Sequence, residues 1–200
     1  MSRRIVRGYD NEVYRIGLSG GHVVYVRIRR QGEGSFDQEA WAMSLAREAG
    51  VPVPEVLAVD TVSDAEGRHP AMVVADATGH QLEASMGTLS DPQRRRVLVD
   101  LGTVLARLHS IAVLGVWRPD ESGRWPDPDE LRRGFIAERK TERGLLLAAG
   151  LSGPEVDRVI DLLDYSPDTP PRSNFVLCHG DISPEHVFVC DDLQVSGLID

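Results

Sequence analysis

Three residues near the end of the chain have the types and the spacing that phosphoryl transfer needs. Asp181 lies in the segment HGDISPEH, His186 follows it five residues later, and Asp200 comes directly after the apolar segment from Gly197 to Ile199. Phosphoryl transfer asks a protein to orient a nucleophile and to hold cations, and it asks for little covalent chemistry. One carboxylate as base, with an imidazole and a second carboxylate as metal ligands, suits that reaction.

Three short apolar segments are expected to position these residues. Asn174 to Cys178, Val187 to Cys190 and Val195 to Ile199 have the length and composition of β-strands. The loop between the first two carries the chemistry-bearing residues, and a polar turn joins the second to the third. We expect this hairpin to bring Asp200 back beside His186, so that both converge with the base on one cleft.

The same residue types permit a second chemistry. Imidazole and carboxylate ligands together suit Zn²⁺ or Mn²⁺, and a metallohydrolase centre could be built from them. Mg²⁺ prefers oxygen ligands, so a histidine at position 186 is an unusual ligand for that ion. Both interpretations stay open from these residues alone.

The first thirty residues predict strands that could hold a nucleotide phosphate. Residues 6–16 predict a strand, a loop and a second strand, and the pair Gly20-Gly21 predicts a hairpin to a third strand over residues 22–29. Lys140 is the only lysine of the chain, so a cation for phosphate in this half must be an arginine. Arg27 is the candidate, since the guanidinium fork fits phosphate oxygens. The alternative is a solvated residue at the edge of a sheet.

Helical segments follow a predicted crossing between two lobes. Residues 36–48 predict a helix ended by Gly50, and residues 71–74 predict a buried strand that runs into the small residues Ala75 to Gly79. Further on, Asp91 and Pro92 predict the N-cap and first turn of a helix with an apolar stripe that ends near His109, and helices are expected over 131–149 and 154–163.

The segment HGDxxxxH, its following apolar strand and the terminal Ile199-Asp200 resemble the catalytic segment of the aminoglycoside phosphotransferase family. That family of antibiotic and small-molecule kinases usually has HGDxxxxN followed by IDxG or IDW. The resemblance implies an α+β, protein-kinase-like bilobal fold with an antiparallel N-terminal sheet plus a helix and a mostly helical C-terminal lobe that carries the catalytic-loop hairpin. It implies a nucleotide-binding lobe over 1–76 and a partial C-terminal lobe over 77–200.

The resemblance also implies roles for individual residues. Asp181 corresponds to the catalytic base, and His186 with Asp200 corresponds to the Mg²⁺ ligands, His186 standing where the family usually has Asn. Arg27 and Glu39 correspond to the ion pair that holds a cation toward the phosphates of ATP, although Glu39 could instead complement the helix N-terminus.

Two further features carry implications from the same resemblance. The backbone around Ala75 and Ala77 corresponds to the adenine-binding hinge. His109, in the segment LARLH, and His179 are expected to be structural residues rather than ligands.

The acceptor implied by the resemblance is a hydroxylated small molecule, such as an aminoglycoside or another antibiotic. The formal net charge of −9 fits a cationic acceptor and argues against nucleic acid as a partner. The tryptophan- and carboxylate-rich loop over 116–130 could bind such an acceptor or could be a solvated connection.

The chain shows no apolar segment long enough for a membrane span and no signal peptide, and we expect a cytoplasmic protein. Cys178 and Cys190 are expected to be buried, reduced thiols.

The family has further helices after the residue that corresponds to Asp200, so the resemblance predicts a truncated chain with an incomplete C-terminal lobe. Two hypotheses follow. The first is an ATP-dependent O-phosphotransferase, and the second is a catalytically silent kinase-like remnant that at most binds nucleotide. They share every motif, so the sequence does not separate them.

Overall fold

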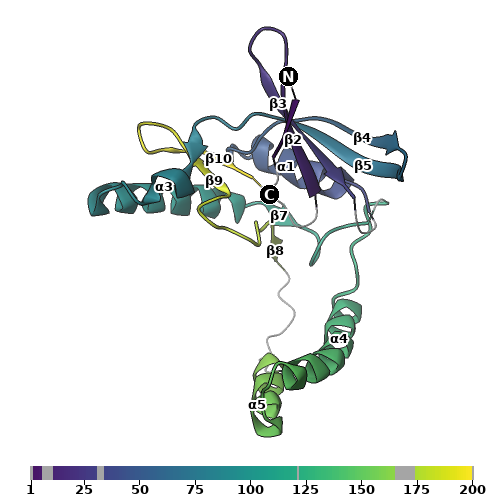
Figure 1. Cartoon of the computed structure of the whole chain (residues 1–200). Coiled ribbons are helices and arrows are strands. Elements are labelled where there is room, and N and C mark those ends of the chain that lie inside the picture. Colours follow the sequence, from purple (N-terminus) through teal and green to yellow (C-terminus); the bar gives the residue numbers. More distant parts are fainter. Residues whose placement is uncertain (1, 6–10, 31–33, 121, 165–173, 200) are drawn as a thin grey trace. The chain divides into compact units, whose positions relative to one another are not determined.

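The computed structural model describes residues 2–5, 11–30, 34–120, 122–164 and 174–199. The chain divides into two compact units, one of Met1–Ala112 with Val176–Asp200 and one of Val113–Phe175 (Figure 1). The division into lobes that we predict after residue 76 falls inside the first unit and stays a prediction. Within the described ranges, no helix has the length and apolar character needed to cross a membrane.

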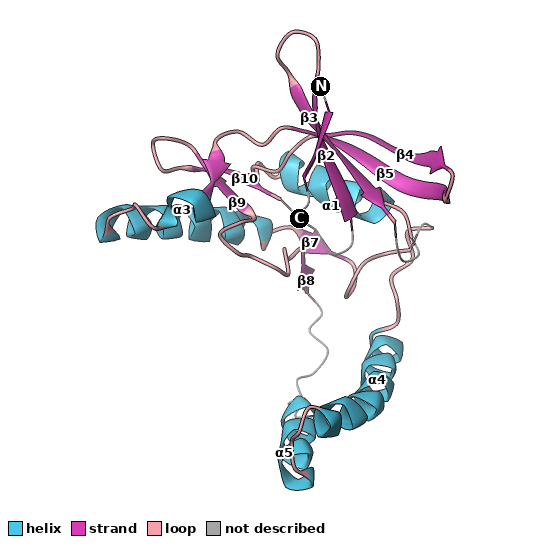
Figure 2. Cartoon of the chain, viewed as in Figure 1, coloured by secondary structure: helices cyan, strands magenta, loops and turns pink. Residues whose placement is uncertain are grey.

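The first unit begins with a five-stranded antiparallel sheet (Figure 2). Its strands lie in the order β1-β2-β3-β5-β4, with the bounds β1 Ser2–Ile5, β2 Asn11–Gly17, β3 Val23–Arg29, β4 Val56–Asp64 and β5 Gly67–Ala75. A tight turn joins β2 to β3 where both Gly20 and Gly21 have positive φ, of 88° and 84°. Glycine adopts this backbone region without steric cost, and the predicted Gly-Gly hairpin is confirmed.

The helix α1, Asp37–Glu48, packs its apolar side against this sheet. Phe36, directly before the helix, and Met72 of β5 are fully buried in the shared core. The helix ends in a Schellman arrangement, in which Gly50 N donates to Arg47 O and Val51 N donates to Ala46 O. Gly50 has a φ of 76°, which explains why glycine follows the helix as the sequence predicts.

A second core in the same unit surrounds the helix α3, Asp91–Leu108. Its buried stripe of Val97, Leu101, Val104 and Leu108 follows the helical period that the sequence predicts. The N-cap differs from our prediction: Ser90 occupies this position, with Gln93 completing a capping box, and Asp91 is the first helical residue. In this capping box the Ser90 side chain accepts from the Gln93 amide, and the Gln93 side chain accepts from the Ser90 amide.

The segment that carries the candidate site packs on this second core. The strands β6 His80–Gln81, β9 Val187–Val189 and β10 Val195–Leu198 form a three-stranded sheet in the order β10-β9-β6, and the short helix α2, Leu82–Met86, follows β6. The carboxylate of Asp100, on α3, accepts a hydrogen bond from the amide of Val195 at 2.7 Å. This bond holds the first residue of β10 against the helix.

The second unit contains two helices, α4 Pro128–Ala148 and α5 Gly153–Asp164. Asp127 caps α4 by accepting hydrogen bonds from the amides of Asp129 and Glu130. The strands β7 Ala112–Val113 and β8 Phe175–Val176 are paired where the chain passes from one unit to the other. Only two residues of the strand predicted over 174–178 are therefore extended and paired.

Candidate active site

The loop between β8 and β9 holds the candidate base at its surface. The side chain of Asp181 is 84% exposed, whereas that of His186 is only 13% exposed. The amide of His186 donates to Ser183 O at 3.0 Å, which closes a turn between the two candidate residues. The Asp181 carboxylate thus faces solvent, whereas His186, later in the same loop, is packed into the protein.

His186 is fixed by a hydrogen bond to the backbone of the candidate base. Its Nδ1 lies 2.8 Å from Asp181 O. A carbonyl oxygen only accepts hydrogen bonds, so Nδ1 carries the proton and the lone pair of the neutral ring is on Nε2. A hydrogen bond of this kind is what sets the tautomer and orientation of a ligating histidine in metal proteins.

His179 ties the same loop to the end of β10. Its Nε2 donates to Ile199 O at 3.1 Å, and its Nδ1 lies 3.4 Å from the amide of Asp181. One tautomer satisfies both contacts, with the proton on Nε2 and the lone pair on Nδ1. The amide of Ile199 in turn donates to His186 O at 2.9 Å. The structural role that we expect for His179 is confirmed by these contacts.

Asp200, the second predicted metal ligand, lies outside the described residues. The residue before it, Ile199, contacts both His179 and His186, so the described end of β10 reaches the loop. Among the residues with described positions, no three His, Cys, Asp or Glu side chains come together as a metal site. Metal binding by His186 and Asp200 therefore stays a prediction that includes a residue of undescribed position.

Arg27 and Glu39 form the ion pair that we expect from the sequence. The guanidinium of Arg27, on β3, donates to the carboxylate of Glu39, on α1. The side chains are 14% and 27% exposed, and the guanidinium also lies 5.6 Å from the centre of the Phe36 ring. Glu39 also lies in the first turn of α1, so its negative charge interacts favourably with both the Arg27 guanidinium and the helix N-terminus. The role toward phosphate stays a prediction.

The predicted hinge follows β5 and contacts the strand that leads to Asp200. The amide of Ala75 donates to Glu55 O at 2.8 Å. Adenine binding by the backbone around Ala75 and Ala77 stays a prediction. A methyl group added at Gly197 would lie 3.3 Å from the Cβ of Ala77, which places Ala77 directly against β10. The side chain of Ser196 donates to Thr78 O at 2.6 Å.

Burial, followed by the charge of Asp76, raises the pKa of the Tyr25 phenol above its ordinary value. Tyr25 lies on β3 opposite Val74, one residue before the end of β5. The strand β5, which leads into the proposed hinge, therefore lies beside a phenol that is neutral at physiological pH.

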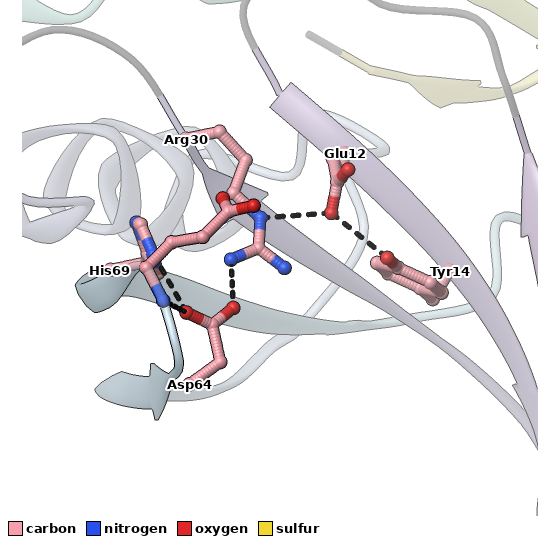
Figure 3. A network of polar contacts seen from close by, with 6 residues as sticks. Glu12, Tyr14, Arg30, Asp64 and His69 are labelled. Atoms are coloured by element: carbon pink, nitrogen blue, oxygen red, sulfur yellow. Dashed lines mark hydrogen bonds and ion pairs between the residues drawn. The ribbon is translucent and has the colours of Figure 1, made fainter.

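A polar network braces the sheet at the end of the strand that carries Arg27 (Figure 3). Arg30, directly after β3, donates to Glu12 on β2 at 2.9 Å and to Asp64 at the end of β4. Tyr14 donates to the same Glu12 carboxylate at 2.8 Å, and His69 lies 3.3 Å from Asp64. The network joins four strands whose residues are far apart in the sequence, and the sequence analysis missed it because its members share no motif.

We expect this network to make the stability of the protein depend on pH in acid. The hydrogen bond from Arg30, followed by that from the amide of Glu66, lowers the pKa of Asp64 from 3.8 to about 2. A carboxyl whose pKa is lowered by folding stabilises the protein above its unfolded pKa, and this contribution is lost as the pH falls through the folded pKa. Asp64→Asn should therefore be less stable than wild type at pH 6, and the difference should become much smaller as the pH falls from 4 to 2.

The measurement is the urea midpoint of wild type and Asp64→Asn at pH 6, 4, 3 and 2. The matched control is Asp60→Asn, on the same strand, whose carboxylate accepts a hydrogen bond from the amide of Thr61 and from no other group among the described residues. A difference between wild type and Asp64→Asn that is equal at pH 6 and pH 2 would contradict the expectation.

The predicted acceptor loop lies in the second unit and is built around Asp120. Its carboxylate accepts hydrogen bonds from the hydroxyl and amide of Ser122 and from the amide of Arg124. These bonds, led by the one from the Ser122 hydroxyl, lower the pKa of Asp120 to about 2. Trp117 is 67% exposed and has a φ of 67°, which is uncommon for a bulky residue. The described residues from 116 to 127 form neither a helix nor a strand, as predicted, but the prediction is wrong for residues 128–130, which are the first residues of α4 because Asp127 caps the helix there.

The cysteines differ from our prediction of buried thiols. Cys178 is exposed and Cys190 is half-buried, and both are free. Exposure alternates along residues 174–178, and Cys178 lies on the same exposed face as Val176.

The chain is similar to known proteins both in sequence and in fold. The profile of the phosphotransferase enzyme family, APH, matches residues 2–200. No curated protein matches the chain.

Three solved structures share its fold. The amicoumacin kinase hAmiN, in complex with AMP-PNP, Ca²⁺ and Ami, is 15% identical with a TM-score of 0.64, and the match covers 100% of this chain and 57% of that one. A variant of the aminoglycoside 2'-phosphotransferase-IIIa in complex with GDP is 18% identical, with a TM-score of 0.59 and coverage of 100% and 65%. A GDP and kanamycin complex of an APH(2") enzyme is 20% identical, with a TM-score of 0.61 and coverage of 100% and 66%.

These matches confirm the predicted fold class, an α+β protein-kinase-like fold with an antiparallel N-terminal sheet. The chain spans 57–66% of the length of these relatives.

Proposed function

We propose a reaction for this chain from the premise that it belongs to the phosphotransferase enzyme family APH, whose profile it matches over residues 2–200. The reaction is transfer of the γ-phosphoryl group of ATP to a hydroxyl group of a small molecule. The observation that carries the proposal is the exposed carboxylate of Asp181 on a loop whose backbone is held by two histidines. A base must be accessible and fixed at the same time, and this loop combines both properties.

Asp181 is proposed as the general base. The bond that forms joins the acceptor oxygen to the γ-phosphorus, the bond that breaks joins this phosphorus to the β–γ bridging oxygen of ATP, and the hydroxyl proton passes to the Asp181 carboxylate. Orientation of the acceptor and stabilisation of charge supply most of the rate in such reactions. His186 donates to Asp181 O, and the Asp181 amide donates to Nδ1 of His179. Both bonds use backbone atoms of Asp181, so they leave its carboxylate to the acceptor.

The nucleotide is assigned to the groups around the N-terminal sheet. Arg27, held by Glu39, is proposed to contact the phosphates, and the backbone of Ala75 and Ala77 is proposed to contact adenine. The carboxylate of Glu39 keeps the guanidinium in one orientation, which lowers the entropy that phosphate binding would otherwise cost.

His186 and Asp200 are proposed as ligands of Mg²⁺. The tautomer of His186, with its lone pair on Nε2, has the form of a metal ligand, although Mg²⁺ favours oxygen. A bound divalent cation neutralises charge on the transferring phosphoryl group. Asp181, His179 and the backbone of Ile199 orient the loop independently of that ion.

The acceptor is proposed to be a cationic, hydroxylated antibiotic of the aminoglycoside kind. The net charge of −9 favours a cation, and the low pKa of Asp120 keeps its carboxylate anionic in the loop of the second unit. We also propose a cytoplasmic location, which the two free thiols suit.

The test is direct detection of phosphoryl transfer. The purified chain is incubated with γ-labelled ATP or GTP, Mg²⁺ and a panel of aminoglycosides, macrolides and hydroxylated metabolites, and nucleotide binding is titrated in parallel. Label appearing in one acceptor class supports the proposal and identifies the substrate. Nucleotide binding without transfer to any acceptor supports the silent remnant, and the absence of both refutes the proposal.

Replacing Arg27 with alanine should weaken ATP binding by about tenfold or more, because a charge-assisted phosphate contact is worth roughly 1.5–3 kcal/mol. Glu39→Gln should give a smaller loss, since the amide oxygen still accepts from the guanidinium. The measurement is the Kd for ATP by calorimetry. Arg29→Ala is the matched control: this side chain lies over the same Phe36 ring but donates to the backbone of Ser35. Equal losses in the Arg27 and Arg29 variants would argue against the assignment.

A further inference from the structure

Residues 80–83, directly after the proposed hinge, form hydrogen bonds with the loop that carries the proposed base. The side-chain amide of Gln81 donates to Glu185 O at 2.9 Å, and the backbone amide of Glu83 donates to Pro184 O at 3.0 Å. Strand pairing continues the contact, since Gln81 lies opposite Phe188 and His80 lies opposite Val189. Two successive carbonyls of the loop are thus held by a segment about one hundred residues earlier in the chain.

The contact of Gln81 controls one peptide plane of the loop. The carbonyl of Glu185 and the amide of His186 belong to the same rigid peptide unit. Gln81 binds the carbonyl end of this unit, and Ser183 O accepts from its amide end at 3.0 Å. A peptide unit held at both ends cannot rotate about its flanking dihedral angles without breaking a hydrogen bond.

The orientation of this peptide unit affects the proposed base, Asp181, through the side chain of His186. The Cα of His186 is the last atom of that plane, and the imidazole that it carries donates through Nδ1 to Asp181 O at 2.8 Å. A rotation of the plane therefore changes the position from which the ring reaches Asp181. Because His186 is only 13% exposed, its ring cannot compensate by moving outward freely.

The residues between the proposed hinge and Gln81 also contact the strands β9 and β10. Gly79 has a φ of 90°, and a Cβ at this position would lie 2.3 Å from Val189 O, so the chain passes β9 at a distance that only glycine permits. Thr78 O accepts from Ser196 on β10. Five residues lie between Ala75 of the proposed hinge and Gln81, and the last four of them contact the hairpin of β9 and β10.

We infer that Gln81 is a positioning residue for the phosphoryl transfer reaction, acting through the Glu185–His186 peptide on the orientation of His186 and Asp181. The inference rests on the proposed function. Hydrogen-bond donation by the Gln81 amide, rather than packing of its methylene groups, is the property that does this. The side chain makes the bond at the protein surface, where its net contribution to folding is small.

The first test compares Gln81→Met with wild type. Methionine keeps the length of the side chain and lacks the donor. We expect kcat to fall about two- to tenfold, as loss of one hydrogen bond predicts, with the KM for ATP within twofold and the urea midpoint close to wild type. The control is His80→Ala, the exposed neighbour on the same strand, which should leave kcat unchanged. An unchanged kcat in Gln81→Met would overturn the inference.

The second test uses Gln81→Glu to separate donation from packing. An ionised glutamate cannot donate to the Glu185 carbonyl, whereas the protonated acid can. The ratio of mutant to wild-type kcat should be low at pH 8 and should rise toward one as the pH falls to about 5, near the range in which a carboxyl beside a carbonyl oxygen gains its proton. Glu83, Glu185 and His186 are the charged and titratable groups near this position, and the wild-type profile, measured over the same pH range, is the reference. A ratio that stays constant with pH would assign Gln81 a packing role only.

A third measurement does not depend on catalysis. Imidazole ¹⁵N shifts report the tautomer and hydrogen bonding of His186, and they should move in Gln81→Met and stay in place in His80→Ala. If wild type transfers no phosphate, the proposed function fails while these shifts still decide the positioning of His186 by Gln81. If the shifts do not move in Gln81→Met, the inference fails even when wild type is an active kinase.

Discussion

Replacing Asp181 with asparagine is expected to lower kcat for phosphoryl transfer by about 10²–10⁴-fold, the usual contribution of a positioned general base. Asparagine has nearly the same shape but cannot take the acceptor proton. The hydrogen bonds that fix the loop use the backbone atoms of residue 181, at 2.8 Å from His186 and 3.4 Å from His179, and these atoms are unchanged by the substitution. The loss should therefore appear in kcat, with the Kd for ATP within about threefold of wild type.

The measurement is single-turnover transfer of labelled phosphate, with ATP binding determined on the same preparations. Asp191→Asn is the matched control, because it makes the same chemical change at an exposed position in the turn between β9 and β10. Transfer by Asp181→Asn at a third or more of the wild-type rate would show that this carboxylate is not the base. A large rise in the Kd for ATP would instead indicate that the substitution disturbs the loop.

Replacing Gly79 with alanine is expected to destabilise the first unit by about 2–5 kcal/mol. Two costs add. A left-handed backbone costs an L-residue roughly 1–2 kcal/mol, and an overpacked site costs roughly 1–3 kcal/mol more. The added Cβ would lie 2.3 Å from Val189 O and 2.8 Å from Ser196 Oγ, and the first of these is a backbone atom of a strand that cannot move without losing its pairing. Since domains are stable by about 5–15 kcal/mol, this is a large fraction of the total.

Urea unfolding followed by circular dichroism measures this change. Gly87→Ala is the control, because Gly87 ends α2 with a φ of −71° and has no atom within 4 Å of an added Cβ. We expect the control to unfold at or above the wild-type urea midpoint and Gly79→Ala to unfold well below it. Equal midpoints for the two variants would show that β9 does not pass Gly79 as closely as the geometry indicates.

The local structure of this protein is largely readable from its residues. The Gly-Gly hairpin, the end of α1 at Gly50 and the buried stripe of α3 are all confirmed. Each depends on interactions between residues a few positions apart, where backbone geometry gives the sequence a fixed period or demands glycine. The N-cap of α3 is wrong by one residue, because Ser90 and Asp91 both suit the position and the reciprocal bond with Gln93 decides between them.

The same distinction between local and long-range interactions applies to the candidate site. The sequence alone was enough to place Asp181 and His186, the proposed base and the proposed metal ligand, on one loop, because their order and spacing are local properties. The pairing of Arg27 with Glu39, twelve residues apart, followed from family resemblance and is confirmed in the structure. Only the tertiary structure shows what holds that loop and the strand β10: Gln81, 104 residues before Glu185, donates to the loop, and Asp100, 95 residues before Val195, accepts from the first residue of β10. A single side-chain hydrogen bond to a distant backbone atom has no period and no required residue type, so only the folded topology determines which donor meets which acceptor.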